Sequence, residues 1–107
     1  MFKKNIIRSW CAKEGFKRAK DVGDISPSGA YTHHLQIVYH RRQQSALGLI
    51  EERLYFAADM DRERVVFGYL KKNSDVRDGV LLNRNVSCLF AKYTQEHVED
   101  LLNTLID

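Results

Sequence analysis

Apolar residues recur at helical spacing near both ends of the chain. Near the start, five apolar side chains fall on adjoining stripes of one helical face: Phe2, Ile6, Ile7, Trp10 and Cys11. Gly15 is placed to end this helix as a C-cap, so we expect a helix over residues 3–14. Near the end, another apolar set follows the spacing i, i+3, i+4, i+7 and i+8: Val98, Leu101, Leu102, Leu105 and Ile106. Thr94 is the expected N-cap of this second helix, with Glu96 in its first turn.

Between these helices the pattern changes to the alternation that is typical of strands. Over residues 31–42, one set of side chains is expected to face the core: Tyr31, His33, Leu35, Ile37 and Tyr39. The set that points the other way is more polar: Thr32, His34, Gln36, Val38, His40 and Arg42. Residues 24–29 concentrate turn formers, including the only Pro, and predict a loop before this strand.

Two further apolar runs predict a hairpin in the middle of the chain. We expect a strand over residues 48–59 and another over residues 65–70, joined by the short polar interval 60–63 as a tight antiparallel turn. Residues 43–53 are ambiguous, because their apolar positions suit a helix as well as a strand. The strand is the interpretation that we favour.

The remaining segments give weaker signals. Residues 73–85 contain Asp78-Gly79 and several Asn, which predicts a long polar loop whose apolar triplet at 80–82 packs against the core. A β-type run follows over residues 86–91. Residues 16–21 either continue the first helix or form a short first strand.

These elements predict an α+β fold with an N-terminal helix, an antiparallel sheet of about four strands and a C-terminal helix packed on one sheet face. The length of 107 residues suits a single domain, residues 1–107. The later strands are apolar on both faces, as where Val65 and Phe67 alternate with Val66. Because such strands are normally buried on both faces, we expect either a sheet curled around a pocket or a second subunit. A homodimer would form through the second sheet face or through the apolar hairpin.

Composition indicates an ordinary folded protein. Hydrophobic residues make up 44% of the chain and charged residues 29%, which argues against disorder. No apolar run approaches the length of a membrane span, and the first residues carry charge where a signal peptide needs apolar residues, so we expect a cytoplasmic protein without membrane contact. Two cysteines are too few for a disulfide framework, and we expect Cys11 and Cys88 to be buried free thiols.

The charge of the chain is concentrated near its start. The net charge is only +3, but residues 1–20 hold seven basic residues against Glu14 alone. These cations are candidates for binding nucleic-acid phosphates without sequence preference: Lys3, Lys4, Arg8, Lys13, Lys17, Arg18 and Lys20. Arg41, Arg42 and Lys72 would join them if they fold nearby. The alternative interpretation is a solubilising surface on an amphipathic helix.

Catalytic signals are sparse. His34 is the one candidate general acid or base, because it would sit on an open strand face and histidine exchanges protons near neutral pH. The histidine and cysteine spacings do not match a metal site, and no phosphate-binding loop or nucleophile elbow occurs, so we expect no metal and no cofactor. Both cysteines sit in apolar runs where an inert thiol is expected.

One short stretch resembles a known family. Gly15-Phe16 and the segment at residues 29–35, which follow a basic helix, are similar to the helix, Gly-Phe pair and histidine-bearing strand of HicA-type RNA-cleaving toxins over some twenty-five residues. The resemblance implies a ribonuclease that uses His34. In this chain the loop before the histidines is longer, and at least two further strands follow.

Three functional hypotheses follow, and the first is a non-enzymatic binding module that forms a homodimer and binds nucleic acid through the basic residues at 3–20. The second is a small-molecule or protein-interaction module with an aromatic-lined pocket: Tyr31, Tyr39, Tyr55, Phe67 and Tyr69. The third is the ribonuclease-like toxin that uses His34.

Overall fold

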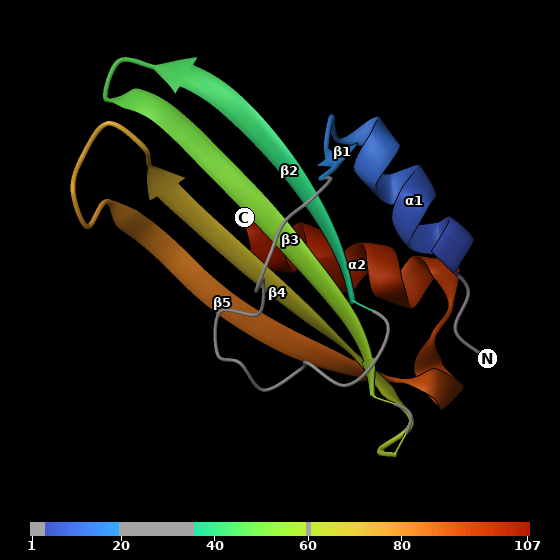
Figure 1. Cartoon of the computed structure of the whole chain (residues 1–107). Coiled ribbons are helices and arrows are strands. Elements are labelled where there is room, and N and C mark those ends of the chain that lie inside the picture. The colour runs from blue at the N-terminus through green and yellow to red at the C-terminus, as the bar shows by residue number, and fades with distance from the viewer. Residues whose placement is uncertain (1–3, 20–35, 60) are drawn as a thin grey trace.

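The computed structural model describes residues 4–19, 36–59 and 61–107. In chain order the elements are α1 (Lys4–Lys13), β1 (Lys17–Arg18), β2 (Gln36–Ser45), β3 (Gly48–Asp59), β4 (Arg64–Asn73), β5 (Val80–Leu89), the short 3-10 helix η1 (Phe90–Lys92) and α2 (Gln95–Ile106) (Figure 1). The strands form one sheet in the order β1-β2-β3-β4-β5, with every neighbouring pair antiparallel. The predicted α+β fold is therefore confirmed, with the two-residue strand β1 added at one edge.

Both helices lie on the same side of the curved sheet (Figure 1). The core forms between them and the facing sheet residues, and it includes Trp10 of α1 and Leu102 of α2. Trp10 also joins the helices through a polar contact, because its indole N–H donates to Asn103 Oδ1 at 3.1 Å. Two core aromatics of neighbouring strands, Phe56 and Phe67, meet edge to face with ring centroids 5.6 Å apart. Among the described residues, neither helix has the length and apolar character needed to cross a membrane.

The predicted N-cap of α2 and the predicted glycine after α1 are both confirmed. The Thr94 side chain accepts a hydrogen bond from the His97 backbone N–H at 3.3 Å and caps α2. Val98, Leu102 and Leu105 are the buried residues of that helix. Gly15 follows α1 with a φ of +83°, a conformation in which glycine ends a helix without the steric cost of a Cβ.

Strand β2 extends beyond the C-terminal end that was predicted for it. The strand was expected over residues 31–42, and the structure describes it over Gln36–Ser45, three residues further at its end. The predicted residues 31–35 lie outside the described part of the chain. Ile37 and Tyr39 face the core as expected. The strand continues to Ser45 because it pairs with β3 as far as Ser45 and Gly48, where a two-residue turn closes the hairpin. The strand interpretation of residues 48–59 is confirmed, and the helix alternative for 43–53 is wrong.

The largest correction concerns residues 73–85, which were predicted to be a long loop. Strand β5 already begins at Val80, so the connection from β4 spans only residues 74–79. The expected packing of residues 80–82 holds only for Leu82, because Val80 and Leu81 are exposed. Backbone pairing with β4, with an irregularity beside Lys71 and Lys72, makes this polar sequence a strand.

The sheet face opposite the helices is closed in one half. Four side chains on this face are buried within the single chain: Val38, Tyr55, Ala57 and Val66. The sequence predicted a pocket or a dimer because it indicated that apolar side chains on this face would be left uncovered. Because these residues are already buried, that surface gives no support to a partner, and the homodimer stays a prediction.

Candidate functional site

The predicted N-terminal cations divide between helix and sheet. Lys3, Lys20 and the side chain of Lys4 lie outside the described residues. The other four are exposed: Arg8, Lys13, Lys17 and Arg18. On α1, Lys13 Nζ is 4.0 Å from Glu99 Oε1 of α2, whereas Lys17 on β1 is the register partner of His40. The set therefore does not form one surface, and Lys17 belongs to the sheet.

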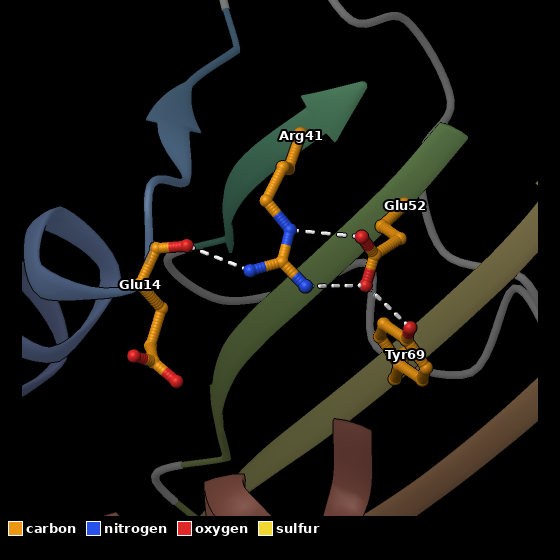
Figure 2. A network of polar contacts seen from close by, with 4 residues as sticks. All are labelled: Glu14, Arg41, Glu52 and Tyr69. Carbon is orange, nitrogen blue, oxygen red and sulfur yellow. Dashed lines mark hydrogen bonds and ion pairs between the residues drawn. The ribbon is translucent and has the colours of Figure 1, made fainter. Parts of the chain in front are cut away.

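Arg41, one of the cations considered as an addition to this set, is held on the helix side of the sheet (Figure 2). Its Nε and Nη2 atoms donate to the two carboxylate oxygens of Glu52, each at 2.8 Å. Tyr69 donates its hydroxyl hydrogen to Glu52 Oε2 at 2.6 Å. The third guanidinium nitrogen, Nη1, donates to the backbone carbonyl of Glu14 at 2.7 Å. The guanidinium also lies 4.2 Å from the centroid of the Phe16 ring.

This network connects the end of α1 to the sheet, and its polar groups bind one another, so we interpret it as structural. Burial alone would raise the pKa of Glu52, but the hydrogen bonds from Arg41 and Tyr69 outweigh it and hold that pKa below its ordinary value. Burial and the bond to Glu52 raise the pKa of Tyr69. At neutral pH the carboxylate is therefore ionised and the phenol neutral. Since Arg41 binds the carbonyl just after α1, it also supplies a cation at the negative end of the helix.

The opposite face of the sheet carries cations in two adjacent rows. Cα partners across β1, β2 and β3 place Lys17, His40 and Arg53 in one row. Two residues further along the strands, Arg42, Glu51 and Lys72 are partners across β2, β3 and β4. Directly paired residues project to the same face, so both rows share one surface. We call five of these residues the sheet cation cluster: Lys17, His40, Arg42, Arg53 and Lys72.

Glu51 is the carboxylate at the centre of this cluster. Its Oε1 is 2.9 Å from Arg53 Nε, and its Oε2 is 3.7 Å from Arg42 Nε and accepts from Ser74 Oγ at 3.3 Å. Burial alone would raise the pKa of Glu51, but the bond from Arg53 and the charges of Arg53, Lys72 and Arg42 together keep it below the ordinary value. One ionised carboxylate thus faces four Lys or Arg side chains and one histidine.

The sheet cation cluster is open to solvent while the neighbouring half of the same face is buried. The Arg42 side chain is 58% exposed and that of Arg53 is 33% exposed. Lys17 is exposed, and His40 and Lys72 are half-buried. Asp75, an acidic residue of the adjoining loop, accepts a hydrogen bond from the Leu49 backbone N–H at 2.8 Å. The open half of the face therefore offers excess positive charge on four consecutive strands.

The described residues of the predicted aromatic pocket do not come together in the structure. Tyr39, Phe67 and Tyr69 are buried in the core on the helix side, whereas Tyr55 is buried on the opposite face, so these four do not line one concavity. Tyr31 and His34 lie outside the described residues. Within the described ranges, no group of three or more His, Cys, Asp or Glu side chains is arranged to hold a metal ion.

Both cysteines are free and buried, as expected. Burial raises the pKa of Cys11 to about 12 and also raises the pKa of Cys88. A thiol with a raised pKa carries little thiolate at neutral pH and is a poor nucleophile. Neither cysteine is a candidate for catalysis.

The structure also shows a cavity of about 400 Å³ between β5 and α2. Its lining combines three apolar side chains with three polar ones: Val86, Leu101, Leu105, Arg84, Asn85 and Thr104. Arg84 Nη1 donates to the backbone carbonyls of Leu105 and Asp107 at 3.3 and 3.0 Å. None of the aromatic residues predicted to line a pocket takes part.

Sequence reasoning missed His40 and Arg53 as members of a cationic surface. The alternation over residues 31–42 already placed His40 and Arg42 on one face, which was the signal available for half of the cluster. Arg53 and Lys72 needed the register between strands, which aligns them with His40 and Arg42.

No protein-family model, curated protein or solved structure matches this chain. The α+β architecture by itself assigns no activity, because one fold can carry many unrelated functions. A functional conclusion must therefore come from the sheet cation cluster and its charges.

Proposed function

We propose that this chain is a non-enzymatic binding module for the phosphate backbone of nucleic acid, with the sheet cation cluster as its contact surface. One observation carries the proposal: four Lys or Arg side chains and a histidine share the open half of a sheet face, where Glu51 is the one carboxylate among the described strand residues. Positive surfaces of this kind attract phosphates by electrostatics and counterion release.

The geometry of the cluster supports a polymer as the ligand. Its cations lie on β1 to β4, and with about 4.8 Å between neighbouring strands the cluster is about 14 Å wide. That width matches the axial length of about four phosphates on one strand of a duplex. Because the side chains project from paired strands, little backbone ordering is needed on binding.

Backbone contacts alone carry no sequence information, so we expect binding without sequence preference. Tyr55, the aromatic residue of the buried half that lies next to these cations, exposes too little of its ring for a base to stack on it. We therefore expect similar affinities for unrelated sequences of equal length.

A titration of fluorescently labelled DNA and RNA oligonucleotides tests the proposal. With about four phosphate contacts, the logarithm of the binding constant should fall with the logarithm of salt concentration with a slope of about −3 to −4. Binding that does not respond to salt, or no binding at low salt, would contradict the proposal.

Paired variants locate the surface. Arg42→Ala with Lys72→Ala should weaken binding and reduce the magnitude of the salt slope by about 2, since each cation contributes about one unit. The matched control is Arg8→Ala with Lys13→Ala, which removes two exposed cations from α1. Equal losses from both pairs would show that the sheet cation cluster is not the contact surface.

A further inference from the structure

Strand β5 forms an outer edge of the described sheet. The Phe90 N–H donates to the Glu63 carbonyl at 2.8 Å, which continues the β4–β5 register one residue beyond the strand. In an antiparallel pair, the residues that hydrogen-bond to the partner alternate with residues whose backbone groups point away. The outward set on β5 is therefore Asn83, Asn85, Ser87 and Leu89. Within the described ranges, no strand pairs with this side of β5.

This edge has few of the features that keep edge strands from pairing. Edges in monomeric proteins are commonly protected by charges, by prolines, by β-bulges or by very short strands. The one irregularity in the described β4–β5 pairing falls at Leu81, outside the central residues 83–87. Strand β5 is ten residues long, contains no Pro, Lys, Asp or Glu, and carries Arg84 as its one charge. Near its ends it exposes three large apolar side chains, Val80 at 57%, Leu81 at 50% and Leu89 at 52%.

The sequence of β5 is complementary to itself in one antiparallel register. A two-fold axis at Asn85 pairs Asn83 with Ser87 of a second copy, and all three residues belong to the outward-pointing set. The backbone groups are thus in phase to form about six hydrogen bonds, two for each of three pairs. The same register places Leu81 opposite Leu89 at both ends of the interface.

The charges and the adjoining cavity fit the same register. Arg84 falls opposite Val86 rather than opposite a second Arg84, so no like charges face each other. Arg84 and Val86 also line the cavity between β5 and α2, which therefore adjoins the centre of this interface.

We propose that two copies of this chain pair antiparallel through β5, about a two-fold axis at Asn85, and join their sheets into one continuous sheet. A closed two-fold interface of this kind uses the same patch on both copies and leaves neither β5 edge open. The two-fold axis is perpendicular to the sheet, so the rotation keeps each face of the sheet on its own side. Both sheet cation clusters therefore lie on the same face of the dimer. The dimer does not depend on nucleic-acid binding, and its test requires no nucleic acid.

Solution mass measured by light scattering at about 100 μM tests the proposal, and the wild-type chain is expected at twice its 12.5 kDa. Asn85→Pro removes the central outward N–H and should give a monomer without loss of the fold, since that N–H is not used by β4. Asn85→Ala keeps the N–H and should remain a dimer. Matching circular dichroism spectra confirm that both variants are folded. A monomeric wild type, or a dimer that survives Asn85→Pro, would overturn the proposal.

A charge exchange tests the register. Leu81→Lys with Leu89→Lys places lysine against lysine at both ends and should weaken dimerisation by at least about tenfold. Leu81→Glu with Leu89→Lys places opposite charges in the same positions and should restore it. If the two double variants dimerise equally well, the proposed register is wrong.

Discussion

Glu51 and Glu52 are consecutive residues of β3 whose buried carboxylates lie on opposite faces of the sheet, each held by an arginine. Glu52 binds Arg41 and Tyr69 on the helix side, and Glu51 binds Arg53 on the other side. On the helix side, each of the three guanidinium nitrogens of Arg41 donates a hydrogen bond within the protein. On the opposite side, the sheet cation cluster outnumbers the carboxylate of Glu51, and for this reason we propose that side as the binding surface.

Removal of Arg41 should destabilise the fold. Arg41→Ala leaves the buried Glu52 carboxylate without its main partner and removes the cation at the end of α1. We expect the free energy of unfolding to fall by about 2–3 kcal/mol, below the full cost for a completely buried pair because Arg41 is partly exposed. Urea denaturation measures this change. The matched control is Arg42→Ala on the opposite face, for which we expect a loss within about 0.5 kcal/mol; similar losses would contradict the structural role of Arg41.

Acid should weaken the fold through the two glutamates of β3. The pKa values of Glu51 and Glu52 are lowered in the folded chain, so the unfolded chain takes up protons first as pH falls. Their contribution to stability is therefore fully present above about pH 4.5 and is lost as pH falls through the folded pKa values. Denaturation measured from pH 7 to pH 3 should show a shallower decline for Glu52→Gln than for the exposed control Glu63→Gln. Parallel pH profiles for these two variants would exclude a role for Glu52.

The thiols should be unreactive in the folded protein. With a pKa of about 12, Cys11 has about one molecule in ten thousand as thiolate at pH 8, and the side chain is also buried. Cys88 is buried and its pKa is raised as well. An aromatic disulfide reagent should therefore label neither thiol rapidly without denaturant and both in guanidinium. Fast labelling of either cysteine in the native protein would contradict this prediction.

Gly79 should tolerate no side chain. A Cβ at this position would overlap the backbone carbonyl oxygen of Asn73 and lie 2.9 Å from that of Val76. Gly79→Ala therefore has to displace backbone, and we expect a loss of about 1–3 kcal/mol in thermal or urea unfolding. Gly68→Ala is the control, because its Cβ would meet Tyr55 at an ordinary 3.5 Å. Equal stability of the two variants would show that the 74–79 connection is easily rearranged.

The periodicity of the chain by itself determined most of the elements. The apolar stripe that ends at Ile106 gave α2 and its Thr94 cap, and the apolar runs either side of residues 60–63 gave the β3–β4 hairpin. These predictions succeeded because helix and strand patterns of this strength follow from local spacing and burial alone. Only the second half of β5 was predicted, as part of the β-type run over residues 86–91, whose last two residues belong to η1 instead. The first half, residues 80–85, was predicted to be a loop because most of its side chains are exposed and its Asn and Arg residues are typical of loops.

Only the tertiary structure decided which charges meet. Residues 1–20 attracted attention because their cations are close in sequence, yet Lys17 joins Arg42, Arg53 and Lys72 through cross-strand pairing while Arg8 and Lys13 stay on α1. Likewise, neighbours in sequence such as Arg41 and Arg42 separate to opposite faces. Their local alternation is visible in the sequence, but the partner opposite each one depends on strand register, which is a contact between distant segments.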